Sequence, residues 1–416
     1  MTGEVGREET DARHGRTGEV SGMRLRCERL VTPHGVLEPA LVTVTDGFVT
    51  AIASGDGAND DANDGDDAND GDGTAELLPG WTVPGFVDTH VHGGGGADYA
   101  TTDPAEALRG RHFHLAHGTT SSLASLVTAD LDSLLAQIRT LVPLVESGDF
   151  TGLHLEGPFL SAAKAGAHEP SLLRDPDPEV LDQLLEAGQG TIAMVTLAPE
   201  LPGALAVTER LVGAGVVVAV GHTDGDATVV RRALDAGATA ATHLFNAMRP
   251  LHHREPGPVP LLLSDPRAVV ELICDGFHLH PDVVAMAVAA AGPDRVALVT
   301  DAMVAAGAPD GDYRLGHLQV RVARGQARLV GADGQPGSIA GSTLTMADAF
   351  AFVVAAGATV PEAARMAATT PARLHRVDSV GEIRIGARAD LCVVDDRGRL
   401  QRVLRRGEWV PGRTSA

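Results

Sequence analysis

The sequence predicts a mixed α/β fold: a (β/α)8 TIM barrel with a small β-sandwich-like domain built from both chain ends. Eight strand-like apolar runs alternate with helix-like segments after residue 81, and both ends of the chain carry the alternating pattern of β-hairpins. The chain is 44% hydrophobic but only 3% aromatic, which suits buried parallel strands flanked by Ala-rich helices. A doubly wound sheet is the alternative fold.

The N-terminal part of the chain divides into a tail and the beginning of the small domain. Residues 1–22 have no hydrophobic period and predict a disordered tail. Residues 23–83 begin the small β domain with short alternating runs broken by Gly, Pro and Asp. Within them, residues 55–73 carry eight Asp and no Lys or Arg. Because an EF-hand's ordered ligands and closing Glu are missing, we expect a solvated, disordered loop rather than a calcium site.

The barrel is expected over residues 84–378, its first strand run beginning slightly earlier. Helical stretches separate the strand candidates, for example residues 131–145 and 227–236. Repeated β-then-α units of this number imply a closed barrel whose chemistry lies at the C-terminal ends of its strands. The candidates are, in order, WTVPGFVD, TTSSLASLV, TGLHLE, TIAMVTLAP, VVVAVGH, ATAATHLF, VVELICD and RVALVTD.

Two further segments follow the eighth strand run. Residues 305–341 separate it from its helix and contain a hairpin-like pattern, YRLGHLQVRVARGQARLV, which predicts either a flap over the site or a static lid. Residues 381–410 return to β-hairpin patterning. We expect residues 379–416 to pair with the N-terminal segment and complete the small domain.

Charge and cysteine usage exclude several classes of protein. A net charge of −22 argues against a nucleic-acid partner and against an anionic membrane surface. Cys27, Cys274 and Cys392 are far apart and odd in number, which predicts neither a disulfide framework nor a CxxC metal knuckle. The first 22 residues lack the apolar segment of a signal peptide, and no run of about 20 apolar residues is uninterrupted. These features predict a cytoplasmic protein.

Polar residues of the kind that bind metals stand at the ends of the predicted strands. Neutral imidazole and carboxylate suit Zn²⁺, with Fe²⁺ or Mn²⁺ as alternatives, and a hydrolytic site keeps one position open for water. The metal would lower the pKa of that water to about 7. Asp301, after strand eight, could take the water's proton and later deliver it to a leaving amine. The candidate ligands are His90 and His92 after strand one, Glu156 in strand three, His222 in strand five and His243 in strand six.

Two nearby polar residues have simpler interpretations. His154 shares a strand face with Glu156 but lies one layer deeper, so we expect a structural role. Asp275 precedes a glycine and is interpreted as a helix cap rather than as a catalytic group.

Nine motifs in the chain occur in a fixed order: PGFVDTHVHG, HLEGPF, GAH, GHT, THLFNAM, REPG, DGFHLHP, VTDAM and AGSTLTM. With them the chain resembles N-acetylglucosamine-6-phosphate deacetylases of the amidohydrolase superfamily, over residues 23–410. THLFNAM and HLEGPF are the most diagnostic. The resemblance implies a metal-dependent TIM barrel that hydrolyses the N-acetyl group of N-acetyl-D-glucosamine 6-phosphate, giving glucosamine 6-phosphate and acetate.

The resemblance also implies roles for individual residues. The family's metal ligands fall on Glu156, His222 and His243, and its catalytic aspartate falls on Asp301. In similar enzymes the arginine of REPG, here Arg254, comes from the neighbouring subunit to meet the sugar phosphate, which implies a homodimer. A chain of net charge −22 needs such a local cation, and planar Arg binds phosphate bidentately. The implied substrate contacts are Ala167, His168, Asn246, Ala247, Arg254 and His278.

The pair His90 and His92 bears on the number of metals. Some family members keep the pair and hold two metals bridged by the glutamate, whereas others replace it and use one. This sequence keeps it, which predicts a second metal; the alternative is that the pair only orients water or stabilises the site. Lys164 is the only lysine and lies in a loop-like segment, so Glu156 rather than a carboxylated lysine must bridge. That disfavours dihydroorotase, hydantoinase and urease-like functions.

Two other functions remain as alternatives. One is a related amidohydrolase that acts on another N-acyl amine or on a galactosamine phosphate. The other is a catalytically inactive barrel that acts as a binding protein, although such proteins usually lack one or more ligands and here every expected ligand is present.

Overall fold

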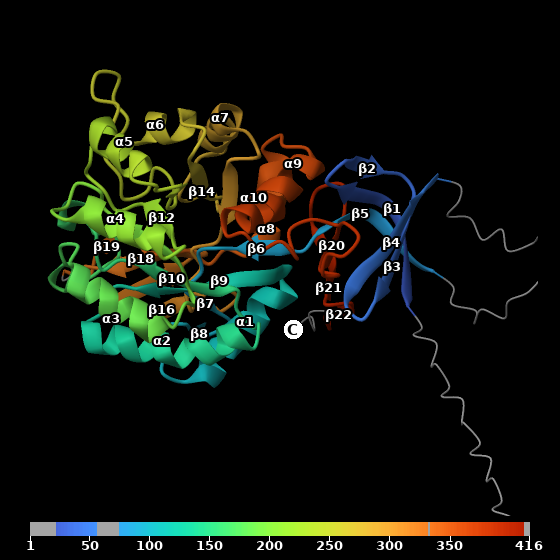
Figure 1. Ribbon diagram of the computed structural model, residues 1–416, viewed down its shortest axis with the longest axis horizontal. Coiled ribbons are helices and arrows are strands. Elements are labelled where there is room, and N and C mark those ends of the chain that lie inside the picture. The colour runs from blue at the N-terminus through green and yellow to red at the C-terminus, as the bar shows by residue number, and fades with distance from the viewer. Residues whose placement is uncertain (1–21, 56–74, 332, 412–416) are drawn as a thin grey trace, which may run out of the picture.

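A ring of parallel strands surrounded by helices forms the larger body of the molecule, and a separate sheet lies beside it (Figure 1). The computed structural model describes residues 22–55, 75–331 and 333–411. The predicted disordered tail, residues 1–22, and the predicted acidic loop, residues 55–73, lie outside the described residues apart from Gly22 and Gly55.

The parallel strands are neighbours in the order in which they follow one another along the chain. The ring is completed between its last and first strands, where Val91 and Ala302 form a parallel bridge and the N–H of Asp301 donates to the carbonyl of His90 at 2.7 Å. The predicted (β/α)8 barrel is confirmed. Its strands are β6 (Phe86–Asp88), β9 (Thr119–Val127), β10 (Gly152–Glu156), β11 (Ile192–Leu197), β12 (Val217–Val220), β13 (Ala240–Ala241), β14 (Val269–Ile273) and β15 (Val296–Val299).

Helices cover the outside of the ring, so a strand such as β9 is buried along its whole length. Aspartates begin several of these helices by accepting orphan backbone N–H groups; Asp130 accepts from Ser133, and Asp226 accepts from Thr228 and Val229. The helical segments are α1 (Pro104–Ala116), α2 (Leu131–Glu146), η2 (Ala162–Lys164), η3 (Pro170–Leu172), α3 (Pro178–Gly188), α4 (Ala204–Gly213), α5 (Ala227–Asp235), α6 (Val259–Ser264), α7 (Pro281–Ala291), α8 (Met346–Ala355), α9 (Val360–Ala364), η4 (Arg365–Thr369) and α10 (Thr370–Leu374).

The inside of the barrel changes from apolar to polar toward the C-terminal ends of the strands. Leu123, Met194, Ala219 and Ala240 form an apolar cluster. Two residues further along the chain from Leu123, Met194 and Ala240, the inward positions are Ser125 in β9, Thr196 in β11 and Thr242 just after β13, as expected from the two-residue repeat of a strand. These hydroxyls and His154 form a connected chain, with His154 Nδ1 2.9 Å from Ser125 Oγ, His154 Nε2 2.8 Å from Thr196 Oγ1, and Thr196 Oγ1 2.7 Å from Thr242 Oγ1. This layer supports the barrel mouth.

The first predicted strand, WTVPGFVD, is wrong as a single element. Its first half belongs to β5 (Glu76–Pro84) of the small sheet, and its second half is β6 of the barrel. The break falls at Gly85, whose N–H donates to the carbonyl of Asp390 at 2.8 Å. A Cβ atom at Gly85 would lie 2.3 Å from Thr120 Oγ1, so the close approach of the backbone to β9 requires glycine.

The small sheet is assembled from both ends of the chain (Figure 1). The two ends meet where β20 pairs antiparallel with β5, and Cys392 lies opposite Val83. Residues such as Leu25, Val42, Leu391 and Leu404 pack into its core. The strands are β1 (Met23–Thr32), β2 (Gly35–Leu37), β3 (Ala40–Thr45), β4 (Phe48–Ser54) and β5 from the N-terminal part, and β20 (Leu391–Val394), β21 (Leu400–Arg405) and β22 (Glu408–Trp409) from the C-terminal part.

The hairpin-like segment after β15 forms an antiparallel sheet of four strands. Its apolar side packs against Val127 and Met303 beside the barrel mouth. The strands are β16 (Gly311–Leu315), β17 (Leu318–Ala323), β18 (Gln326–Val330) and β19 (Pro336–Ile339). A two-stranded ribbon of β7 (Gly93–Gly94) and β8 (Ala97–Asp98) follows His92.

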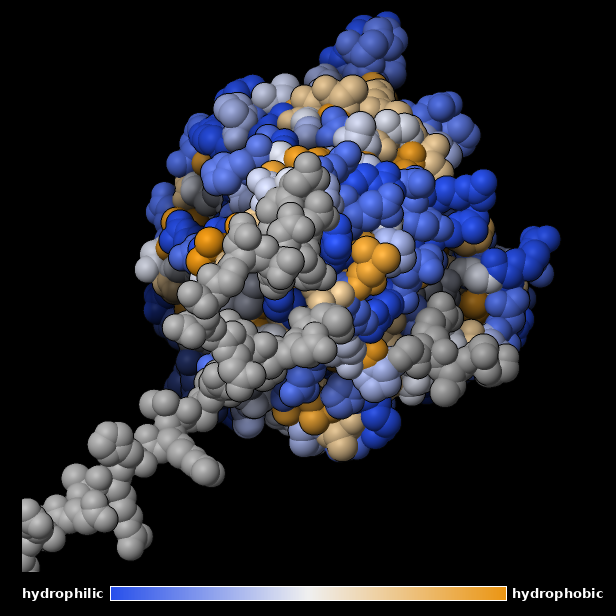
Figure 2. Space-filling model, turned by 90° about the vertical axis from the view of Figure 1, so that its right-hand side faces the viewer, coloured by the Kyte–Doolittle hydropathy of each residue, from blue (hydrophilic) through white to orange (hydrophobic). Residues whose placement is uncertain are grey.

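The molecular surface on the side of the small sheet is mostly hydrophilic, with hydrophobic residues in separate small patches (Figure 2). Across the described ranges, no helix combines the length and the apolar character that a bilayer crossing requires.

Candidate active site

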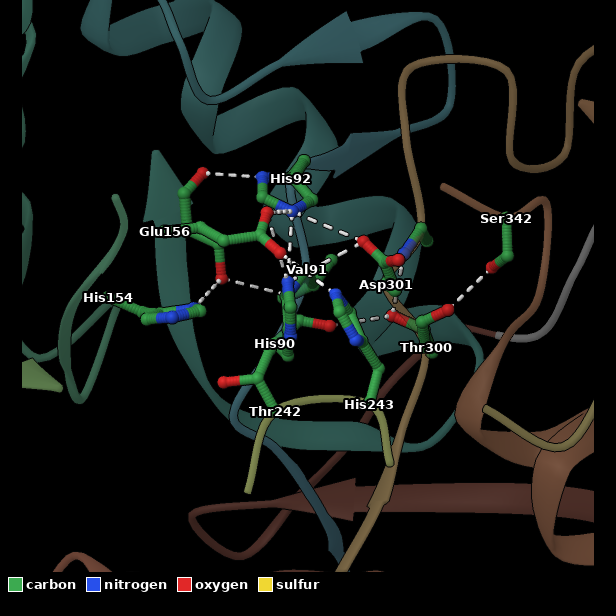
Figure 3. Close-up of polar contacts among 12 residues, drawn as sticks. His90, Val91, His92, His154, Glu156, Thr242, His243, Thr300, Asp301 and Ser342 are labelled. Atoms are coloured by element: carbon green, nitrogen blue, oxygen red, sulfur yellow. Dashed lines mark hydrogen bonds and ion pairs between the residues drawn. The ribbon is translucent and has the colours of Figure 1, made fainter. Parts of the chain in front are cut away.

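Buried polar side chains gather at one mouth of the barrel, where the C-terminal ends of the strands meet (Figure 3). They come from loops directly after β6, β12, β13 and β15 and from the last residue of β10. His222, His243 and Asp301 have positive φ angles of 46°, 27° and 48°. This left-handed conformation is unfavourable for residues other than glycine, and such strain is typical of functional sites. Three of the six residues that the sequence predicts as metal ligands or catalytic base have this conformation.

Glu156 lies at the centre and contacts two pairs of imidazoles. Its Oε1 atom is 3.0 Å from Nε2 of His222 and 3.0 Å from Nε2 of His243. Its Oε2 atom is 3.1 Å from Nε2 of His92 and 3.5 Å from Nε2 of His90. The ligand atoms therefore form two sets that could each hold a metal ion, one of Glu156, His222 and His243 and the other of His90, His92 and Asp301.

The orientation of the imidazole rings fits metal ions. Nδ1 of His222 lies 2.9 Å from the carbonyl of Lys164, and Nδ1 of His92 lies 3.2 Å from the carbonyl of Ser125. Because a carbonyl can only accept, each Nδ1 carries a proton, which leaves each Nε2 as the atom that can bind a metal ion. Nε2 of His222 is nevertheless only 3.1 Å from Nε2 of His243, and Nε2 of His90 is 3.1 Å from Nε2 of His92. Nitrogen atoms that converge this closely require a proton or a metal ion between them, and imidazole with carboxylate is a donor set for Zn²⁺.

The electrostatics of the mouth also favour a cation. Burial alone would raise the pKa of Asp301, but the imidazoles of His90 and His92 outweigh it and lower the pKa to about 2. Burial would likewise raise the pKa of Glu156, but His90 and His168 lower it well below its usual value. Conversely, burial would lower the pKa of His92, but Asp301 and Glu156 raise it to about 9. Both carboxylates are thus ionised at neutral pH and need positive charge beside them, which protonated imidazoles or a metal ion can supply.

A cavity of about 420 Å³ opens over these residues, which is a usual size for a small-molecule site. Val127, Leu315 and Ile339 contribute apolar surface, so the four-stranded sheet forms part of the wall. Five of the six predicted substrate contacts line the cavity, namely Ala167, His168, Asn246, Ala247 and His278.

Arg254, the sixth predicted contact, does not line this cavity. It lies on an exposed loop, where its Nη1 atom is 2.7 Å from Nε2 of His253. Among the described residues, one lysine and no arginine line the cavity. The lysine is Lys164, and its Nζ atom is 3.4 Å from Asp224. A phosphate in this cavity would therefore lack an arginine from the same chain.

His168 and His278 are each oriented by a neighbour. The backbone N–H of Thr128 donates to Nδ1 of His168 at 3.4 Å, which favours the tautomer with a proton on Nε2. That Nε2 lies 3.4 Å from Oε2 of Glu156, so His168 can act as a donor inside the cavity. Asp275 accepts from the N–H of His278 at 2.8 Å and lies 2.7 Å from its Nδ1. The interpretation of Asp275 as a helix cap is wrong, since α7 begins six residues later.

Glu271 is a buried residue of the site that the sequence analysis missed. It lies in the middle of β14, and its Oε2 atom is 3.2 Å from Nδ1 of His90. A signal was present, because VVELIC places one carboxylate inside an apolar strand run, where an unpaired charge is costly.

Comparisons with known proteins identify the family of the chain. A model of the amidohydrolase family matches residues 81–410. A solved structure from Mycobacterium smegmatis, an N-acetyl-D-glucosamine-6-phosphate deacetylase mutant in complex with N-acetyl-D-glucosamine 6-phosphate, is 43% identical with a TM-score of 0.86, covering 94% of this chain and 99% of that one.

Two curated relatives are similar over most of their length. N-acetylgalactosamine-6-phosphate deacetylase of Escherichia coli O157:H7 is 36% identical over 399 residues, which is 94% of this chain and 99% of the relative. N-acetylglucosamine-6-phosphate deacetylase of Lysinibacillus sphaericus is 35% identical over 334 residues, which is 78% of this chain and 84% of the relative. The resemblance inferred from the motifs is confirmed, and the chain belongs to the amidohydrolase family.

Proposed function

We propose that this protein is a metal-dependent deacetylase that hydrolyses N-acetyl-D-glucosamine 6-phosphate to glucosamine 6-phosphate and acetate. The observation that carries the proposal is the Glu156 carboxylate, which contacts two imidazole pairs and faces a sugar-sized cavity. The M. smegmatis structure, 43% identical, is a complex with this sugar phosphate and supports the same substrate class.

The metal ligands in this proposal are Glu156, His222 and His243 for one ion, and His90, His92 and Asp301 for a second. Imidazole and carboxylate donors suit Zn²⁺, with Fe²⁺ or Mn²⁺ as alternatives. When bound, such an ion polarises an amide carbonyl and makes water nucleophilic near neutral pH.

Asp301 transfers the proton in the proposed reaction. Its low pKa keeps it ionised at neutral pH, so it can accept a proton from the attacking water as the new C–O bond forms. It then delivers this proton to the amine nitrogen as the C–N bond breaks. His168, with its proton on Nε2, can donate a hydrogen bond to the substrate carbonyl oxygen as negative charge develops there.

The sugar phosphate is held by residues beyond the metal cluster. Asn246, Ala247 and His278 line the cavity and are substrate contacts in this proposal. Arg254 lies outside the cavity of its own chain, which supports a homodimer in which it reaches the partner's site. Three buried, unpaired cysteines and a phosphorylated substrate suit a reducing cytoplasm.

The second candidate substrate is N-acetyl-D-galactosamine 6-phosphate. The E. coli relative that covers 94% of this chain is named for that activity. The two sugars differ in the configuration of one hydroxyl, so the same metal cluster could act on either.

Acetate release from a substrate panel, with metal analysis of the same protein sample, tests the proposal. The panel contains both 6-phosphates and N-acetylglucosamine without phosphate. We expect turnover of the glucosamine phosphate, less turnover of its galactosamine epimer and little of the phosphate-free sugar. Absence of acetate from both phosphates by metal-loaded protein would refute the function.

A further inference from the structure

Glu271 is a buried carboxylate that contacts His90, a member of the second set of metal ligands. The residue is 0% exposed, and its side chain points into the barrel from the middle of β14. Its Oε1 atom accepts from the hydroxyl of Thr89 at 3.0 Å, and its Oε2 atom accepts from the backbone N–H of His243 at 3.4 Å. Among the described residues, its ion-pair partner is the imidazole of His90. A carboxylate so deeply buried is costly without such partners.

The contact with Glu271 determines how His90 faces the site. Nδ1 of His90 lies 3.2 Å from Oε2 of Glu271, and a carboxylate accepts at this distance, so Nδ1 carries the proton. The lone pair of Nε2 then points toward Nε2 of His92, at 3.1 Å, and toward Oδ1 of Asp301, at 3.5 Å. Carboxylates in this position are known to fix the tautomer and the ring orientation of histidine ligands.

His90 differs in this respect from the other oriented ligands. His92 and His222 are each fixed by a backbone carbonyl, those of Ser125 and Lys164, which no substitution removes. His90 depends on a side chain instead, and a negatively charged one, which also increases the basicity of Nε2.

We propose that Glu271 is a positioning residue that sets His90 as an Nε2 ligand and thereby determines whether a second divalent ion binds at His90, His92 and Asp301. The inference rests on the metal-dependent hydrolase proposed above, but it concerns the number of ions rather than the substrate.

Zn²⁺ titration of the metal-free full-length protein tests this inference, with metal content per chain measured by mass spectrometry. The wild type is expected to bind two ions. Glu271→Gln keeps the shape and can still accept from His90 but lacks the charge, so the affinity for the second ion should fall about 10- to 100-fold. Glu271→Leu removes the acceptor and should leave one ion per chain, at Glu156, His222 and His243.

Two other variants serve as controls. His90→Ala should bind one ion per chain, which identifies the site that is lost. Thr196→Val removes a buried hydroxyl that bonds to His154 and Thr242 without contact to His90, so it should retain both ions. The inference is overturned if the wild type binds one ion, if both Glu271 variants keep the wild-type affinity, or if Thr196→Val loses the second ion equally.

The same samples distinguish this inference from the proposed function. Acetate release is measured on each protein after loading with Zn²⁺. Suppose that the wild type binds two ions and releases no acetate, while Glu271→Leu binds one ion. That result would leave the positioning role intact and would refute the deacetylase function. If Glu271→Leu fails to fold, the isosteric Glu271→Gln variant alone decides the outcome.

Discussion

Oδ1 of Asp301 lies 3.2 Å from Nε2 of His92, so the loop after the last barrel strand meets the loop after the first across the seam of the ring. The contact holds the carboxylate over the cavity, where it also lies 3.5 Å from Nε2 of His90. The imidazoles keep its pKa at about 2 in spite of burial. Asp301 is therefore available as a proton acceptor throughout the neutral range.

Replacement of this carboxylate should remove catalysis while the ion at Glu156, His222 and His243 stays bound. Asp301→Asn has nearly the same shape but cannot accept the proton from water, so acetate release should fall about 100- to 10,000-fold. The ion at Glu156, His222 and His243 does not use Asp301 and should remain, as metal analysis would reveal. A variant that hydrolyses the substrate at the wild-type rate would show that another group is the base.

Removal of Arg254 should affect the phosphorylated substrate selectively. A charge-assisted hydrogen bond to phosphate contributes about 1.5 to 3 kcal/mol, so Arg254→Ala should raise KM for N-acetylglucosamine 6-phosphate about 10-fold or more. KM for the phosphate-free sugar should change little. An equal effect on both sugars would remove the phosphate assignment.

Mixing the two impaired variants, Asp301→Asn and Arg254→Ala, at a substrate concentration well below KM tests whether Arg254 acts on the partner's site. In a dimer of one Asp301→Asn chain and one Arg254→Ala chain, one of the two sites has both Asp301 and a partner arginine. After exchange of subunits, about a quarter of all sites should be intact. Failure of the mixture to regain activity, with mixed dimers verified by mass spectrometry, would place the arginine in its own chain's site or outside catalysis.

His168 should behave as a donor to the substrate and not as a metal ligand. Its Nδ1 faces the N–H of Thr128, which leaves the protonated Nε2 toward the cavity. His168→Phe should therefore keep the metal content of the wild type, while kcat falls about 100- to 1,000-fold, as when an oxyanion donor is removed. Loss of a metal ion from this variant would assign His168 to the ligand set instead.

The sequence predicted the barrel and most of the mouth for a physical reason. Parallel strands buried on both faces form apolar runs, so the polar residue that ends each run, such as Glu156 or His222, marks the catalytic rim. In contrast, the backbone conformation of these residues was not predictable. The positive φ of His243 is unfavourable for its residue type and is imposed by the surrounding fold.

Glu271 and Gly85 illustrate what a single sequence does not reveal. The partner of Glu271 is His90, 181 residues away along the chain, and only the closed ring brings the two together. The break in the first strand at Gly85 depends on the approach of Thr120, which is likewise a tertiary contact. Local patterns identify strands and their ends but not which interior side chains face each other.

His375, after α10, should make the fold sensitive to acid. Both of its ring nitrogens are shut off from solvent without a hydrogen-bond partner in the described part of the chain. Burial lowers its pKa to about 4, although the Glu271 carboxylate opposes the shift. Between pH 6.5 and 4 the unfolded chain therefore binds a proton that the folded chain does not, so stability is present above pH 6.5 and is lost as the pH falls to 4.

Substitution of His375 should remove this part of the pH dependence. The shift corresponds to about 3 kcal/mol between pH 6.5 and 4, so His375→Leu should gain up to about that much relative to the wild type over this window. Urea unfolding of both proteins at pH 7, 6 and 5 measures the difference. His114, whose pKa burial also lowers to about 4, is present in both proteins and cancels. If both proteins lose stability equally as the pH falls, His375 does not cause the loss. Its imidazole would then be protonated in the folded state and would have a hydrogen-bond acceptor there.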